Sequence, residues 1–467
     1  MSARPSTLGQ LREAGWQSRS VKDEMRANAA LAIASGKPIV DGVLGFDETV
    51  LPQLENAVLA GHDVIFLGER GQAKTRIIRA LTALLDEWIP VVAGSEINDD
   101  PLAPVSRQAR ELVEANGEAT PITWLHRSDR FGEKLATPDT SIADLIGEVD
   151  PIKVAEGRYL SDELTLHYGL VPRTNRGIFA INELPDLAER IQVGLLNVLE
   201  ERDVQIRGYK IRLPLDVVLV ASANPEDYTN RGRIITPLKD RFGSQIRTHY
   251  PLDVETELDV IRQEIKPLET AGLGIAVPEF MAEIVAALSQ LARSSPSVNQ
   301  HSGVSVRLGI ANYETLVANA ARRALRSKEP VAVPRISDLE SLVASTAGKV
   351  EIETIDEGRD AQTIERLVKA AVLGVFRQRC RIETFAEAVS AFDEGDVIHS
   401  GDDVSSSEYV EALAKMPALA GPVMALAASE TPGAVASATE FVLEGLHLSK
   451  RLNKEAAGGR ATYRGRS

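Results

Sequence analysis

The 467-residue sequence has a single cysteine, Cys380, and few basic residues relative to acidic ones. A lone cysteine excludes an internal disulfide and a zinc site built on cysteine ligands. Lys and Arg number 52 against 67 Asp and Glu, which gives a net charge of −15. That balance argues against general binding to nucleic acids or anionic membranes, because both need clustered positive charge.

Long apolar runs are also missing. Residues 1–15 hold no apolar signal core, and no stretch of about 18 apolar residues occurs, so we expect a soluble, cytoplasmic protein. Hydrophobic residues make up 44% and charged residues 25%, as in a globular protein of about two to four domains. Residues 450–467 depart from the acidic balance, with six Lys or Arg and one Glu. We expect this stretch to be a solvated or partner-docking tail.

Three short apolar runs predict strands of a parallel sheet that is buried on both faces. They are residues 63–67, 177–181 and 217–221, and helical patterns separate them. Past Pro251 the strand signals stop and helical periodicity takes over. The sequence therefore predicts an α/β core followed by helical domains.

A candidate phosphate loop lies between the first strand and the helical pattern after it. Its residues are Gly68, Glu69, Arg70, Gly71, Gln72, Ala73, Lys74 and Thr75. The glycines permit a tight turn, Lys74 offers charge to the β- and γ-phosphates, and Thr75 offers a hydroxyl to Mg²⁺. The alternative is a polar turn before a helix that begins with lysine, and the strand–loop–helix context favours nucleotide binding. The usual pattern has glycine where this chain has Ala73, and we expect one added methyl group to be tolerated.

The second predicted strand runs into Asn182 and Glu183. After a phosphate loop, such a strand end offers a carboxylate to the Mg²⁺ shell and then a glutamate that polarises the attacking water. Glu183 fits the second role, but Asn182 brings an amide, without negative charge, to the first. We therefore expect slower turnover. The alternative is that the two residues only cap the next helix.

Three further polar residues follow in order. Asn224 ends the third predicted strand, where it can orient the attacking water together with Glu183. Arg241 ends a helical pattern, from which an arginine can reach the γ-phosphate of a neighbouring subunit. Arg307 opens a helix of the second domain. Each signal is weak alone, because most surface arginines are simply solvated, and the three gain weight as an ordered set.

This order of motifs resembles the AAA+ ATPases, and more narrowly the small ATPase subunit of magnesium chelatase and its relatives in the MoxR group. The resemblance covers about residues 38–345. It is carried by the phosphate loop and by residues 51–57, 140–157, 169–178, 195–200, 223–226 and 240–243. It implies a P-loop core with a pore-facing hairpin insert and an all-helical lid. Beyond about residue 350, helical periodicity alone predicts a helical C-terminal extension.

The resemblance also implies an ATPase that uses ATP with Mg²⁺, in a ring of six copies of this chain. Thr75 and Asn182 would then contact the metal, Glu183 would activate water, and Asn224 would be the first sensor. Arg241 would be the arginine finger and Arg307 the second sensor. Such proteins remodel a partner, often one that carries a von Willebrand A domain.

The predicted domains follow from these assignments. They are an N-terminal helical segment (1–40), the nucleotide-binding core (41–252), the lid (253–349) and the extension with its basic tail (350–467). The core contains a polar insertion at about 91–120 and the hairpin insert at about 140–172.

Two functions remain open at this point. The first is a motor that remodels its partner, and the second is a nucleotide-gated scaffold that binds ATP and assembles but hydrolyses little, because Asn182 replaces the usual aspartate. A transcriptional activator of the sigma-54 type would need a Gly-Ala-Phe-Thr-Gly-Ala-like loop, which the sequence lacks.

Overall fold

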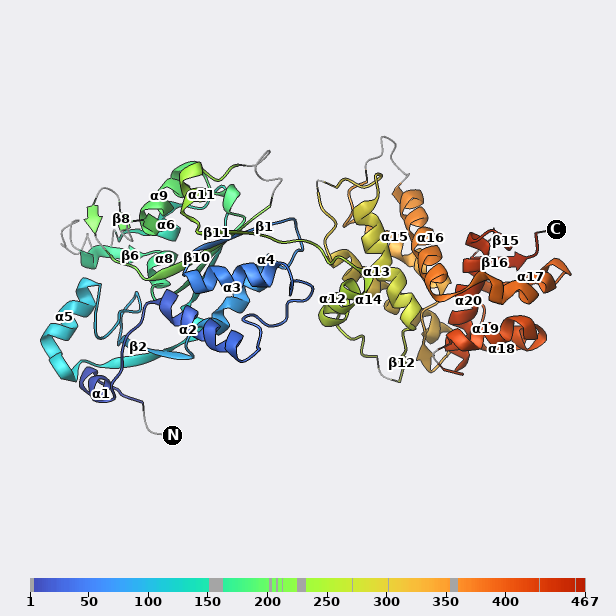
Figure 1. Ribbon diagram of the computed structural model, residues 1–467, viewed down its shortest axis with the longest axis horizontal. Coiled ribbons are helices and arrows are strands. Elements are labelled where there is room, and N and C mark those ends of the chain that lie inside the picture. Colours follow the sequence, from blue (N-terminus) through green and yellow to red (C-terminus); the bar gives the residue numbers. More distant parts are fainter. Residues whose placement is uncertain are drawn as a thin grey trace. The chain divides into compact units, whose positions relative to one another are not determined.

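The computed structural model describes residues 4–150, 163–200, 204–206, 209–211, 213–224, 232–270, 272–300, 302–352, 360–427, 429–457 and 459–466. The chain divides into two compact units, Met1–His249 and Tyr250–Ser467 (Figure 1). Within the described part of the chain, no helix is both long and apolar enough to cross a lipid bilayer.

A five-stranded parallel sheet organises the first unit. In chain order its strands are β1 (Val64–Leu67), β4 (Phe131–Leu135), β7 (Gly177–Asn182), β10 (Val217–Ala223) and β11 (Ser244–Arg247). Their order across the sheet is β11-β1-β10-β7-β4, with every neighbouring pair parallel. The three central strands are those predicted. The edge strands β4 and β11 were missed because their half-exposed, partly charged residues give no continuous apolar run.

Helices cover both faces of this sheet (Figure 1). On one face lie α2 (Val21–Ala34), α3 (Val50–Ala60) and α4 (Lys74–Ala80), and on the other α9 (Glu189–Glu200) and α11 (Thr236–Arg241). Strand β7 serves both cores, because Ile178 and Ala180 join the first set of helices while Phe179 and Ile181 join the second. This two-sided burial is why the strand reads as an unbroken apolar run.

The two predicted inserts contain regular structure. An antiparallel pair, β2 (Trp88–Val92) and β3 (Ile122–His126), frames the polar insertion, which holds α5 (Arg107–Asn116). Strands β5 (Gly147–Val149) and β6 (Leu166–Tyr168) pair antiparallel at the base of the hairpin insert. Residues 151–162 of that insert, with Pro225 and Glu226 of the expected motif, lie outside the described residues. The remaining elements of this unit are α1 (Leu8–Glu13), α6 (Ile142–Leu145), α8 (Leu170–Arg173), β8 (Val204–Ile206) and β9 (Tyr209–Ile211).

The second unit is mostly helical. Its helices are α12 (Val254–Glu264), α13 (Glu279–Ser294), α14 (Arg307–Ser327), α15 (Leu342–Ala347), α16 (Asp360–Arg379), α17 (Ala386–Asp393), α18 (Ser406–Lys415), α19 (Pro417–Leu426) and α20 (Pro432–Leu448). One hydrophobic core, from Leu258 to Tyr463, joins the predicted lid and the predicted extension. Helix α20 is buried along most of its length, including Phe441, which stacks on Phe280 with ring centroids 4.4 Å apart. A short parallel pair, β12 (Gly274–Ile275) and β13 (Val331–Ala332), also lies in this unit.

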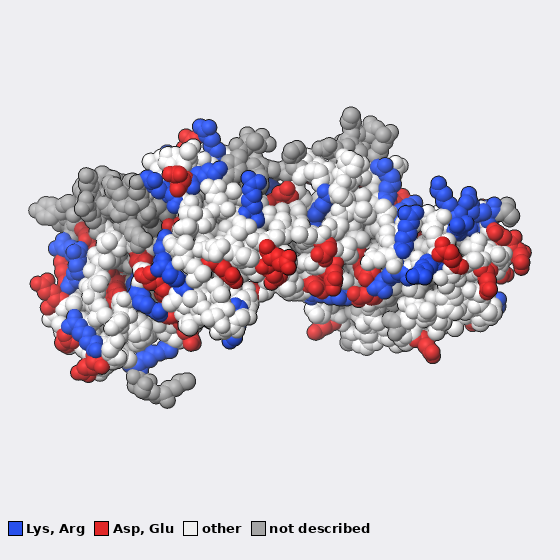
Figure 2. All heavy atoms as spheres, in the orientation of Figure 1, with Lys and Arg blue, Asp and Glu red and all other residues white. Residues whose placement is uncertain are grey.

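The basic C-terminal stretch differs from the expected solvated tail. It forms strands β15 (Asn453–Ala457) and β16 (Arg460–Arg464), and β16 also pairs with β14 (Ile398–Gly401). Tyr463 is 2% exposed and its hydroxyl donates to Glu444 at 2.6 Å, whereas Arg460 is exposed and pairs with Asp403. Basic side chains therefore gather on the outer side of this hairpin (Figure 2). The charge count concealed a strand whose alternate residues face the core.

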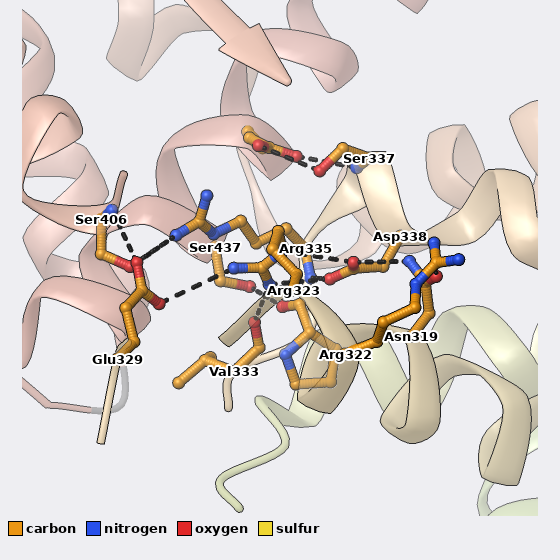
Figure 3. Close-up of polar contacts among 12 residues, drawn as sticks. Asn319, Arg322, Arg323, Glu329, Val333, Arg335, Ser337, Asp338, Ser406 and Ser437 are labelled. Carbon is orange, nitrogen blue, oxygen red and sulfur yellow. Dashed lines mark hydrogen bonds and ion pairs between the residues drawn. The ribbon is translucent and has the colours of Figure 1, made fainter. Parts of the chain in front are cut away.

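A buried ionic network ties the predicted lid to the extension (Figure 3). Asp338, which is fully buried, accepts hydrogen bonds from Arg323 at 2.9 Å and from the backbone N–H of Arg335 at 2.8 Å. The Arg335 guanidinium, also fully buried, donates to the carbonyl of Val404 at 2.8 Å and to the hydroxyl of Ser406. Because its charges are buried, removing one partner weakens the compensation of the other.

We therefore expect Asp338→Asn to destabilise the second unit by about 3–5 kcal/mol, since it removes the carboxylate to which the buried Arg323 donates and leaves it with Glu329, 3.8 Å away. Hydrogen–deuterium exchange in urea, followed over residues 250–467 by mass spectrometry, measures this change. The control is Asp402→Asn, because Asp402 is exposed. Equal stability of the two variants would contradict a stabilising role for the network.

Candidate functional site

The phosphate loop joins β1 to α4 and contains two residues in the left-handed region of backbone space. Gly71 has φ 76° and Ala73 has φ 54°. An L-residue with a side chain pays roughly 1–2 kcal/mol in that region, whereas glycine does not. The loop therefore forms with alanine at this position, at a small local cost.

The beginning of the loop is fixed to the end of β11. The side-chain amide oxygen of Gln72, Oε1, accepts a hydrogen bond from the Glu69 backbone N–H at 3.0 Å and another from the Thr248 hydroxyl at 2.8 Å. A Cβ on Gly68 would lie 2.0 Å from the Thr248 hydroxyl oxygen, so only glycine fits there. Gln72 thus holds the loop through a side chain that is 6% exposed and turned into the protein.

Lys74, Asn224 and Glu183 are linked by hydrogen bonds into a set that we call the Lys–Asn–Glu triad. The Lys74 ammonium donates to the side-chain oxygen Oδ1 of Asn224 at 2.7 Å, and the side-chain nitrogen Nδ2 of Asn224 donates to Glu183 Oε2 at 2.8 Å. Lys74 and Asn224 are each 7% exposed. The ammonium also donates to the backbone carbonyls of Gly68 and Glu69, the latter at 2.8 Å. Three of the predicted site residues, one at the start of α4 and one directly after each of β7 and β10, therefore meet at one edge of the sheet.

The backbone at Glu183 is bent at the end of β7. Glu183 has φ 55°, and its backbone N–H donates to the Ser222 hydroxyl at 3.3 Å. A non-glycine residue in the left-handed region is uncommon, and such residues cluster at functional sites. The bend carries the Glu183 carboxylate to Asn224.

Asn182 lies beside a carboxylate that the sequence analysis missed. Its amide donates to Glu133 Oε1 at 2.5 Å, and its carbonyl oxygen accepts from the Ser222 hydroxyl at 3.2 Å. Glu133 belongs to the edge strand β4 and is also paired with Arg79 of α4, at 2.8 Å from Nε to Oε2. This hydrogen bond raises the pKa of Arg79. The signal that could have revealed Glu133 was β4 itself, which was not predicted.

The two predicted arginines lie on helices α11 and α14. Arg241 ends α11, with a side chain that is 36% exposed and 3.9 Å from Asp240. Arg307 is the first residue of α14, in the second unit, and is exposed. The roles of Arg241 and Arg307 stay predictions.

The residues at this edge fit a nucleotide phosphate with Mg²⁺. Lys74 provides a buried cation, Thr75 a hydroxyl and Asn182 an amide oxygen, while Glu133 and Glu183 are carboxylates. Mg²⁺ prefers oxygen ligands and is usually held by one or two protein groups plus phosphate oxygens. The donor set therefore suits Mg-ATP.

Comparison with known proteins agrees with this chemistry. A family described as the Sigma-54 interaction domain matches residues 155–241. The magnesium-chelatase 38 kDa subunit of Cereibacter sphaeroides is 33% identical over 210 residues, which cover 42% of this chain and 54% of that protein. The magnesium-chelatase subunit ChlI of a Nostoc species is 30% identical over 246 residues, which cover 50% of this chain and 61% of that protein. The chain thus spans little more than half the length of these relatives.

Solved structures with some similarity include a model of the complex between subunits BchI and BchD of magnesium chelatase. It is 23% identical with a TM-score of 0.36, over 71% of this chain and 98% of that one. NtrX of Brucella abortus in complex with ATP is 15% identical with a TM-score of 0.39, over 75% of this chain and 66% of that one.

The parallel sheet with helices on both faces, the phosphate loop at the end of β1 and the chelatase relatives agree with one another. The predicted fold class and the resemblance stated from the sequence are both confirmed. Over about half of its length, the chain is similar to the 38 kDa and ChlI subunits of magnesium chelatase.

Proposed function

We propose that this chain binds and hydrolyses Mg-ATP and uses the energy to remodel a partner protein. The observation that carries the proposal is the Lys–Asn–Glu triad, which links a phosphate-loop lysine to a strand-end glutamate through one asparagine. A protein that only bound nucleotide would not need a carboxylate held at the position of the attacking water.

The residues would act as follows. Lys74 would break its hydrogen bonds to the backbone carbonyls of Gly68 and Glu69 and donate instead to the β- and γ-phosphates. The hydroxyl oxygen of Thr75 would coordinate the metal. Thr75 and Asn182 would hold Mg²⁺, which would neutralise the charge that develops on the phosphates. Glu183 accepts a proton from the water that attacks the γ-phosphorus, and Asn224 orients that water. Because Asn224 is hydrogen-bonded to both Lys74 and Glu183, displacement of Lys74 by phosphate changes the position of the general base.

We further propose a ring of copies of this chain, in which Arg241 of one copy completes the site of the next. Its position at the exposed end of α11 is compatible with that role. Arg307 would act as the second sensor. A von Willebrand A domain is the partner that the family resemblance favours. The pairing of BchI with BchD, named for a similar structure, is an example of a partner protein in that system.

Asn224→Ala tests the role of the Lys–Asn–Glu triad in turnover. Loss of the amide removes the link between Lys74 and Glu183, and we expect turnover to fall by about 10–100-fold, because small misplacements of reacting groups have effects of this size. Affinity for ATP, measured by calorimetry, should change far less. Asn116→Ala, at the exposed end of α5, is the matched control. Unchanged turnover in Asn224→Ala would contradict the proposed role of the Lys–Asn–Glu triad.

A nucleotide-gated scaffold is the second candidate, and Asn182 is the observation in its favour. An amide in place of a carboxylate weakens the hold on Mg²⁺. Analytical ultracentrifugation measures assembly, and phosphate release measures turnover. Assembly that depends on ATP, with no measurable wild-type turnover, would favour the scaffold over the motor.

A further inference from the structure

Asn182 and Glu133 form a matched pair on neighbouring strands. The Asn182 amide donates to Glu133 Oε1 at 2.5 Å, and the register of β4 against β7 places Glu133 opposite Ala180 and Leu135 opposite Asn182. Residues two apart on a strand share a face, so Glu133, Ala180 and Asn182 lie on one side of the sheet. Ala180 belongs to the core beneath α4, which identifies that side as the one facing the phosphate-loop helix.

Contacts from α4 confirm where the Glu133 carboxylate lies. Arg79 donates to it twice, at 2.8 Å from Nε to Oε2 and at 3.1 Å from Nη2 to Oε1. Thr75 precedes Arg79 by four residues and therefore lies on the same face of the helix, one turn closer to the loop. Glu133 thus lies next to Asn182 and beneath the helix face that carries the predicted metal-binding hydroxyl.

An aspartate does not fit at position 182 in these surroundings. The side chain there must donate to Glu133 and accept from Ser222, which an amide does and a carboxylate cannot. Two carboxylates at this separation repel each other, and one of them would have to take up a proton. Asparagine is therefore the residue that the neighbouring glutamate requires.

The ion pair with Arg79 does not preclude another role for Glu133. The Arg79 side chain is 63% exposed, so the pair is open to solvent on that side, whereas the Glu133 side chain is 21% exposed. Exposed pairs of this kind contribute little free energy and are readily exchanged for a stronger partner.

We propose that Glu133 supplies the negative charge at the Mg²⁺ shell that position 182 does not, so that the carboxylate has moved from β7 to the adjacent strand β4. Glu133 would accept hydrogen bonds from metal-bound water, oriented by Asn182. This inference rests on the proposed binding of Mg-ATP. It also removes the main reason to expect a scaffold, because the site keeps its carboxylate.

An exchange of the two side chains tests the assignment. Affinity for a fluorescent N-methylanthraniloyl ATP is titrated against Mg²⁺, with EDTA as the metal-free reference, in the wild type, Glu133→Gln, Asn182→Asp and the double variant. We expect the Mg²⁺-dependent gain in affinity to fall by about tenfold in each single variant, since contacting groups couple by this amount. The double variant, which restores one amide and one carboxylate, should recover to near the wild-type value.

Glu111→Gln is the matched control, because Glu111 is an exposed carboxylate that pairs with an arginine in the same unit. Thermal melting of each variant excludes unfolding as the cause of a loss. A wild-type response in Glu133→Gln, or tighter Mg²⁺-dependent binding in Asn182→Asp alone, would overturn the assignment and leave the proposed function standing. Failure of the wild type to bind the nucleotide would overturn both.

Discussion

Glu183→Gln is expected to lower Mg-ATP turnover by about 10³-fold while ATP still binds, because the amide cannot take the proton of the attacking water. The glutamine keeps the size of the side chain and can still contact Asn224. Affinity for ATP should therefore stay near the wild-type value, and bound ATP should persist.

Phosphate release and calorimetric titration of the same preparation measure the two effects separately. The control is Glu189→Gln, which alters an exposed carboxylate, 67% accessible, at the first residue of α9. If Glu183→Gln hydrolysed ATP as fast as this control, Glu183 would not be the general base.

Arg241→Ala is expected to lower turnover by about 10³-fold, since an arginine supplied to the γ-phosphate has effects of this order. Binding of ATP by the isolated subunit should be little changed, because Arg241 would act on the neighbouring copy.

A mixture of two inactive variants makes this prediction sharper. Lys74→Ala lacks the phosphate-binding lysine but keeps Arg241, and Arg241→Ala has the reverse defect. In a mixed ring, some interfaces combine an intact Lys74 with an intact Arg241. We expect the mixture to hydrolyse ATP faster than either variant alone, and a rate equal to their mean would contradict a shared site.

The central part of the fold was predictable because it obeys simple patterning. Strands β1, β7 and β10 are buried on both faces and therefore read as apolar runs. The edge strand β4 is half-buried along most of its length and carries Glu133 and Lys134, so nothing in its composition set it apart from a loop. The C-terminal hairpin was hidden for a related reason, because its outward-facing basic residues dominated the composition.

Most residues of the candidate site were predictable from the sequence, but the contact between Asn182 and Glu133 was not. Lys74, Glu183 and Asn224 were named from their order along the chain, and the structure brings them within hydrogen-bonding distance. Asn182 was read as the loss of a carboxylate. Only the register of β4 against β7 reveals that Glu133 is its neighbour, and register between distant segments is not written in either segment alone.

The measurement that tests the central claim most directly is steady-state phosphate release by the wild-type chain with ATP, in Mg²⁺ and in EDTA. We predict turnover that requires Mg²⁺ and is lost in Lys74→Ala. A wild-type chain that neither binds ATP nor releases phosphate in Mg²⁺ would contradict the account.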